Sequence, residues 1–349
     1  MISSAASRIG RVQPVLQSAR PLVAVLTCVL AVAVHAQGIA GQGQGDTAAA
    51  ANVSLLQRIQ NSAQQLNYTG VFTYQQGASM QSSRVTHIAD SKGEHERLEI
   101  LDGQPLEFLR ENDDIQCLIP AKKAILVEKR TTRDRFPGLM LGKADQLAAN
   151  YNVTVDPQSE RVADRDCQVI NVHPKDNDRY GYRLCADTSS GLLLRAQTLS
   201  SEAGVVEQVA FMTLQVGSDV DAAQLKPKWS TKDWKVIRAQ LTPTDLAANG
   251  WSVAETAGFH TVTQLQRSMG GKQNVKQIML SDGLAAISIF IEPFSNAHPQ
   301  QVGSSSRGAI HVVGRRLGDY WITVLGEAPL GTIQRVAASV DYHPVSRRP

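Results

Sequence analysis

The chain has 349 residues, a formal net charge of +3 at pH 7 and four cysteines. At about 150 residues per domain, this length predicts two domains, each with a hydrophobic core of its own. A charge so close to zero gives no electrostatic reason to bind nucleic acid, and no nucleic-acid partner is expected.

The first 36 residues have the pattern of a secretory signal peptide. Three arginines and no acid lie before or beside an apolar run from Leu22 to Val34, and Val34-His35-Ala36 fits the small-x-small rule for cleavage. The apolar run is too short for the ~20 residues that span a bilayer, which disfavours the alternative of an uncleaved anchor. Removing residues 1–36 makes the mature chain formally neutral. The expected location is the periplasm, where disulfides form.

Residues 37–52 are rich in Gly, Gln and Ala without a hydrophobic period, which predicts a disordered lead-in. Ser54 is then a candidate N-cap, with Gln57 as its capping-box partner. Apolar residues recur at helical spacing from Leu55 to Leu66, so this segment is predicted to form an amphipathic helix.

A strand pattern with a period of two begins at Tyr68. Six short runs separated by turn-rich segments follow and predict a β-meander, large enough to wrap around the preceding helix. Residues 136–153 interrupt this rhythm and are expected to form a loop and a short helix. Further strands are expected at about 160–163, 166–173, 179–187, 192–200 and 204–216, which complete a first domain over residues 53–216.

A polar segment without periodicity at 217–230 is the expected domain linker. Residues 231–345 then contain four strand-like runs and a helical segment at 329–340, and they form the expected second domain. The predicted fold class is α+β. It consists of a large curved antiparallel sheet, an open half-barrel that cups helices, followed by a smaller antiparallel sheet with a helix.

No catalytic or metal-binding motif is complete in this sequence. "HERLE" (95–99) begins like a zinc-protease helix but carries Glu99 where the second His belongs. The seven histidines after residue 36 are scattered, without the spacing of metal ligands. We therefore expect no enzymatic activity, no metal and no cofactor, which disfavours an exported hydrolase.

The segment "CQVINVHPKDNDRYGYRLC" (167–185) concentrates charged residues between two cysteines. A hairpin centred on Asp176 that joins the apolar residues on one face also places Cys167 opposite Cys185. This register predicts a disulfide between them, with Cys117 as the remaining thiol. The polar residues in the middle are interpreted as a solvated turn. A catalytic cluster is disfavoured because no base–nucleophile pair is evident.

Several separated blocks carry a resemblance to a known family. They are "YTGVFTY" (68–74), "CQVINVHPKDNDRYGYRLCADTSSGLLLR" (167–195), "VVEQVAF" (205–211) and "SDGLAAISIFIE" (281–292). Together they resemble the RseB/MucB family, periplasmic regulators of the envelope-stress sigma factor. The resemblance covers residues 53 to 343 approximately, with the blocks in order.

This resemblance implies a first domain similar to the LolA and LolB lipoprotein carriers and a smaller α+β second domain. It implies that the protein binds the periplasmic part of a membrane anti-sigma factor of the RseA or MucA type. It further implies that the bound factor is shielded from the site-1 protease, and that lipid or lipopolysaccharide releases it. The alternative is a plain LolA-type lipid or lipoprotein carrier, for which a second domain of this size would be unnecessary.

The strands of the first domain offer candidates for a lipid cavity. The predicted lining residues are Phe72, Tyr74, Leu98, Ile100, Leu106 and Phe108, and an apolar flap over the mouth would use Leu139, Met140 and Leu141. The alternative is that these side chains are ordinary core.

Partner contacts are predicted in and after the linker. The candidates are Trp229, Trp234, Arg307, Arg315 and Arg316. Packing of the two tryptophans between the domains is the alternative. The sequence does not determine whether the chain forms a homo-oligomer.

Overall fold

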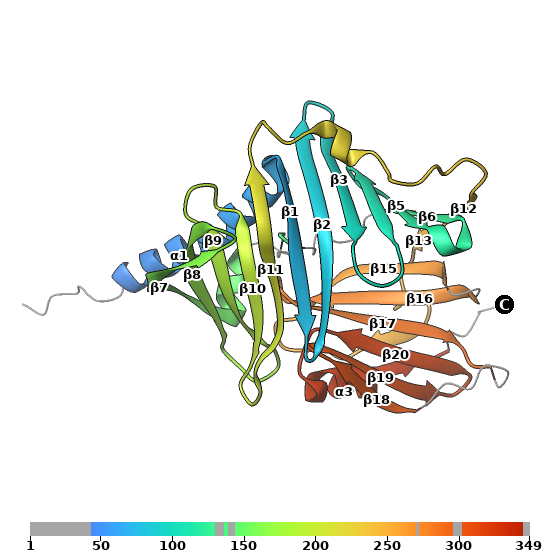
Figure 1. Ribbon diagram of the computed structural model, residues 1–349. Coiled ribbons are helices and arrows are strands. Elements are labelled where there is room, and N and C mark those ends of the chain that lie inside the picture. Colours follow the sequence, from blue (N-terminus) through green and yellow to red (C-terminus); the bar gives the residue numbers. More distant parts are fainter. Residues whose placement is uncertain (1–42, 130–135, 139–143, 270–271, 296–301, 345–349) are drawn as a thin grey trace, which may run out of the picture. The chain divides into compact units, whose positions relative to one another are not determined.

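The computed structural model describes residues 43–129, 136–138, 144–269, 272–295 and 302–344. These residues belong to one compact unit, Gln42–Pro349. The signal-peptide prediction falls on residues outside the described part of the chain. Two large sheets account for most of the unit (Figure 1).

The first sheet has twelve strands in the order β12-β6-β5-β4-β3-β2-β1-β11-β10-β9-β8-β7. Its strands are β1 (Tyr68–Gln76), β2 (Ser79–Asp90), β3 (Gly93–Ile100), β4 (Glu107–Glu111), β5 (Asp114–Ile119), β6 (Ala124–Lys129), β7 (Tyr151–Val162), β8 (Arg165–Pro174), β9 (Gly181–Asp187), β10 (Leu193–Ser200), β11 (Gly204–Val216) and β12 (Lys235–Arg238). The pairing of β1 with β11 joins the early meander to the later strands. The sheet stays open, with β7 and β12 at its edges.

The helix α1 (Gly43–Gln65) packs on this sheet through Leu56, Ile59 and Ala63, which are buried at helical spacing. It contacts α2 (Ala144–Asn150) and β7. The prediction of a disordered lead-in is wrong from Gly43 onward, because the helix begins there. Residues 48–51 are four consecutive alanines, the residue with the highest helix propensity.

The second sheet has seven strands in the order β13-β15-β16-β17-β20-β19-β18. These are β13 (Leu241–Pro243), β15 (His260–Met269), β16 (Lys272–Ser281), β17 (Ala286–Pro293), β18 (Gly303–Arg307), β19 (Ile310–Leu317) and β20 (Tyr320–Gly326). A small pair, β14 (Trp251–Val253) with β21 (Val340–Tyr342), and the helix α3 (Leu330–Ser339) complete the domain. Ile333 and Val336 of α3 share a core cluster with Ile287, Ile289 and Val324.

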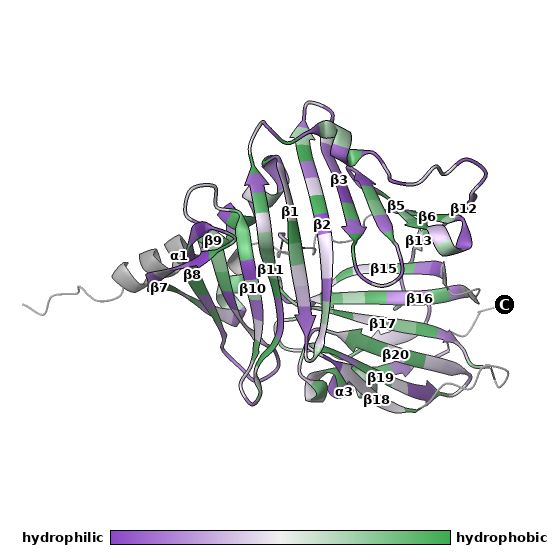
Figure 2. Cartoon of the chain, in the orientation of Figure 1, coloured by the Kyte–Doolittle hydropathy of each residue, from purple (hydrophilic) through white to green (hydrophobic). Residues whose placement is uncertain are grey.

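The architecture confirms the predicted fold class: mostly sheet, few helices, a large open sheet and a smaller second one. Figure 2 shows hydrophobic and hydrophilic residues mixed along β1, β2 and β3.

The chain just beyond the expected boundary at residue 230 returns to the first sheet. β12 lies beyond it but pairs in parallel with β6, with Lys235 opposite Ala124 and Arg238 opposite Val127. The first sheet therefore takes its last strand from the segment assigned to the second domain. The expected linker also lies on the sheet, where Gln224 Oε1 accepts a hydrogen bond of 2.9 Å from Thr69.

The 167–185 hairpin forms, but its register differs by two residues from the expected one. Val169 lies opposite Cys185, and Val172 lies opposite Tyr182. Cys167 and Cys185 are therefore diagonal neighbours, joined by a disulfide with 5.4 Å between their Cα atoms. The loop between β8 and β9 also contacts the second domain. Arg179, expected in a solvated turn, is fully buried against the second domain.

Candidate ligand cavity

A cavity of about 680 Å³ lies where the two sheets face each other. One wall comes from the first sheet and includes five predicted lining residues, Phe72, Tyr74, Leu98, Ile100 and Phe108. Leu106 does not line it. The strand β4 begins one residue later, so Leu106 lies beyond the end of the strand. Leu139, Met140 and Leu141 lie outside the described residues.

The pleat explains why the five side chains face the cavity. Phe72 and Tyr74 are two residues apart on β1, so they lie on one face of the sheet. Leu98 of β3 lies opposite Phe108 of β4 in a cross-strand pair. Phe136 closes the apolar end, with its ring 5.2 Å from that of Phe72. The sequence analysis expected a loop from residue 136 onward but did not name Phe136 among the lining residues.

The other wall comes from the second domain and was missed by the sequence reasoning. Its lining residues are Met279, Leu284, Ala286, Ser288, Ile310, Leu325, Gly326 and Glu327. Alternation along "LAAISIFIE" predicts that one face of β17 is buried, but no local signal indicates what the other face meets. The two walls come together only through contacts between the domains.

One end of the cavity is polar. Tyr182, Thr198 and Glu207 line it, next to Tyr74. Glu207 Oε2 accepts hydrogen bonds from Gln76 Nε2 at 3.1 Å and from the Ala309 amide at 3.2 Å. Burial, and then a hydrogen bond to Glu207, raise the pKa of the Tyr74 hydroxyl well above its usual range. The phenol therefore stays neutral and serves as a hydrogen-bonding group.

The two domains are joined beside this cavity by a buried polar cluster. Asp282 accepts a hydrogen bond from Tyr151 at 2.7 Å and pairs with Arg179 at 2.9 Å. Its other oxygen accepts bonds from the Leu284 and Ala285 amides. Since Leu284 lines the cavity and belongs to a core cluster of the first domain, this loop links the cavity to the domain contact.

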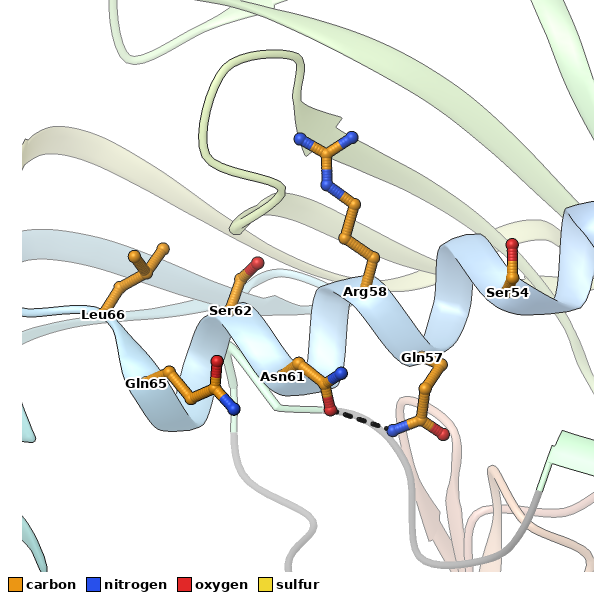
Figure 3. A pocket seen from close by; sticks show the side chains of 7 residues that line it. All are labelled: Ser54, Gln57, Arg58, Asn61, Ser62, Gln65 and Leu66. Carbon is orange, nitrogen blue, oxygen red and sulfur yellow. Dashed lines mark hydrogen bonds between the residues drawn. The ribbon is translucent and has the colours of Figure 1, made fainter.

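A second hollow lies along α1 and is lined by Ser54, Gln57, Arg58, Asn61, Ser62, Gln65 and Leu66 (Figure 3). Gln57 donates to Asn61 Oδ1 at 3.0 Å. Ser62 donates to the Ser190 carbonyl at 2.8 Å, in the turn between β9 and β10. The contacts of Ser62 and Arg58 dock the helix on the sheet.

The described part of the chain was also searched for groups that could bind a metal ion. No cluster of three His, Cys, Asp or Glu that could hold a metal occurs among those residues. Nor does any described helix have the length and hydropathy needed to cross a membrane.

Comparison with known proteins identifies the family. The family model for the MucB/RseB N-terminal domain matches residues 51–229, and that for the C-terminal domain matches residues 245–341. The chain belongs to the MucB/RseB family. The resemblance seen in the sequence is thereby confirmed.

The relatives are named as regulators of sigma factors. The sigma factor AlgU regulatory protein MucB of Pseudomonas aeruginosa is 31% identical over 294 residues, covering 82% of this chain and 89% of that protein. The sigma-E factor regulatory protein RseB of Escherichia coli K12 is 25% identical over 305 residues, covering 85% and 92%.

Solved MucB structures have the same fold. The P. aeruginosa MucA/MucB complex matches with a TM-score of 0.66 at 27% identity, covering 84% of this chain and all of that one. A structure of MucB with MucA(peri) matches with a TM-score of 0.65, also at 27% identity, covering 84% of this chain and 99% of that one.

The five residues predicted to bind a partner are not gathered into one surface by their contacts. Trp229 is half-buried under Lys228 near β3 and β4, and Trp234 precedes β12. Arg307 is exposed and donates to Ser79 at the turn between β1 and β2. Arg316 lies 4.0 Å from the centre of the Phe294 ring.

Arg315 has a structural role in this member of the MucB/RseB family. Its Nε donates to the Ala337 carbonyl at 2.6 Å, and its terminal nitrogen bonds to the Val340 carbonyl. These carbonyls end α3, where a cation is favourable. The guanidinium therefore caps a helix.

Proposed function

We propose that this protein is a periplasmic regulator that binds the periplasmic segment of a membrane anti-sigma factor. The observation that carries the proposal is the match to MucB solved with MucA(peri), which extends over 84% of this chain. The match spans both domains, which supports the proposal for the chain as a whole. In the same proposal, the bound anti-sigma factor is shielded from the site-1 protease.

The cavity supplies the second half of the proposal. An acyl chain of a lipid or lipopolysaccharide enters between the sheets and releases the partner. Support comes from the cavity's composition, since Phe72, Leu98, Ile100 and Phe108 form an apolar wall. Because the opposite wall belongs to the second domain, a ligand there would act on the contact between the domains. A lipid carrier of LolA type shares the apolar cavity but needs no partner-binding domain.

A pull-down with the immobilised periplasmic segment of the anti-sigma factor tests the proposal. The mature protein should be retained, and added lipopolysaccharide or phospholipid should elute it. Absence of retention would contradict regulation by binding. If the protein is retained but neither lipid elutes it, the proposed binding of the anti-sigma factor stands and the proposed release by lipid is contradicted. Lipid binding without retention would favour the carrier.

Export by the signal peptide is part of the same proposal. N-terminal sequencing of protein from the periplasmic fraction should begin at Gln37. A chain that begins at Met1 in the membrane fraction would contradict cleavage and indicate an anchor.

A further inference from the structure

The strand β12 forms one open edge of the first sheet (Figure 1). All four of its residues are exposed, including Val236 at 49% and Ile237 at 43%. It pairs with β6 on one side, and among the described residues no strand pairs with its other side. Such an edge presents unpaired backbone amides and carbonyls, to which an extended chain can add as a further strand.

The backbone groups of β12 that face away from β6 belong to Val236 and Arg238. The amides of Lys235 and Ala239 donate to carbonyls of the segment 123–127, both at 2.9 Å. Because the backbone groups of successive strand residues point to opposite sides, those of Val236 and Arg238 point to the open side. Two amides and two carbonyls are therefore directed toward an incoming strand.

The opposite edge of the sheet, β7, is protected against such pairing. Pro157 lies within this strand, and the pairing with β8 is irregular between Val155 and Ser159. A proline and an irregular stretch both hinder the addition of a further strand. β12 has a regular register with β6 and contains no proline. Of the two edges, β12 is therefore the better acceptor.

The side chains of β12 determine which chain can add. Val236 and Ile237 lie between two cations, Lys235 and Arg238, which form no ion pair with any described residue. The segment 226–238 has five basic residues and one acidic residue. A second copy of this chain would bring like charges together at the edge, which is unfavourable. A strand in which two apolar residues lie between two acidic ones would match both the cations and the apolar side chains.

We propose that the periplasmic segment of the anti-sigma factor adds to β12 as an extended strand. Opposite residues 235–238 this segment has the pattern acidic, apolar, apolar, acidic. Backbone hydrogen bonds to Val236 and Arg238 hold the strand, and the charges of Lys235 and Arg238 favour acidic side chains. The assignment rests on the proposed function and names the edge at which the partner binds.

Binding of the fluorescently labelled periplasmic segment to residues 37–349, measured by fluorescence polarisation, tests the assignment. Val236→Pro removes an outward amide but no hydrogen bond to β6, and proline is compatible with an edge strand. It should weaken binding about tenfold. Lys235→Glu should also weaken binding about tenfold, because a repulsion replaces an attraction. In the wild-type complex, hydrogen exchange at the Val236 and Arg238 amides should slow about tenfold or more.

Lys92→Glu is the matched control for the charge reversal. Lys92 is exposed in the turn between β2 and β3, several strands away from β12, so this variant should bind as the wild type does. Equal affinities in all variants, or unchanged hydrogen exchange at β12, would overturn the assignment while the proposed function stands. If the wild-type protein does not bind the segment, the proposed function fails, and the assignment fails with it.

Discussion

Arg179 and Asp282 form an ion pair of 2.9 Å in which both side chains are fully buried. The two residues come from different domains. The rest of the guanidinium is also satisfied, by Asp176 at 2.9 and 3.0 Å and by the Ala257 carbonyl at 2.6 Å. A buried charge pair is tolerated when such hydrogen bonds compensate for the lost water. The relative position of the two cavity walls therefore depends on this contact.

Arg179→Met should destabilise the protein strongly. It leaves the Asp282 carboxylate buried without its cation, a change that typically costs about 3–5 kcal/mol. Urea unfolding monitored by tryptophan fluorescence measures the loss. We also expect the second domain to detach before the first unfolds, since Arg179 joins them. This would appear as a second transition.

Arg335→Met provides the control for that measurement. Arg335 pairs with Asp178 in the same β8–β9 loop, but its side chain is 59% exposed. Exposed pairs contribute about 0–1 kcal/mol, so the variant should unfold close to the wild type. Equal losses of unfolding free energy in the two variants would show that the buried Arg179–Asp282 pair does not hold the domains together.

The disulfide between Cys167 and Cys185 should contribute about 3 kcal/mol. It closes a loop of 18 residues, which restricts the unfolded chain by about that amount. The double variant Cys167→Ala with Cys185→Ala should show this loss in urea. Dithiothreitol should lower the stability of the wild type but not of the variant. Cys117→Ala, outside the disulfide, should keep the sensitivity to dithiothreitol.

Asp187 should make the protein less stable in acid. Burial alone would raise the pKa of this carboxyl, but hydrogen bonds from Arg165, Ser190 and Ser189 lower it from 3.8 to about 2. The unfolded chain therefore takes up a proton at a higher pH than the folded one. The stabilisation is complete above about pH 4 and disappears as the pH falls toward 2.

Asp187→Asn tests this dependence. The variant should lose stability at pH 6 and should have a shallower decline in unfolding free energy between pH 4 and pH 2. Urea titrations at several pH values give the slope. Because Asp187 orders the turn whose Ser190 carbonyl holds Ser62, α1 should also loosen. An unchanged slope would show that other carboxylates dominate acid unfolding.

The predictable part of this fold depends on near neighbours in the sequence. Alternation predicted the meander from Tyr68 onward, and helical spacing predicted the buried face of α1 at Leu56 and Ile59. The cysteines could be paired because a hairpin places residues near its turn together. These features need no information about distant segments.

The unpredicted features all depend on distant partners. β12 joins β6 in parallel although more than a hundred residues separate them, and four exposed residues give no such signal. The burial of Arg179 in the hairpin turn depends on Asp282, 103 residues away. The second cavity wall was missed for the same reason. Local periodicity shows that a face is buried, but it does not show what covers the face.

Leu98→Gln should weaken binding of acyl chains without unfolding the protein. Leu98 is half-buried in the cavity wall opposite Phe108, so the amide would lie where a hydrocarbon chain binds. Losing apolar contact at about 25 cal/mol per Å² and burying an amide should reduce affinity roughly tenfold or more. Displacement of a fluorescent probe measures the affinity, and circular dichroism checks the fold.

Met212→Gln is the control for this substitution, because Met212 is 60% exposed on β11 and does not line the cavity. It makes a similar change of polarity at the surface, so acyl-chain affinity should stay at the wild-type value. Unchanged affinity in Leu98→Gln would show that the chain does not reach this part of the wall. Collapse of the fold would instead assign Leu98 to the core, which is the alternative reading of the apolar strand faces.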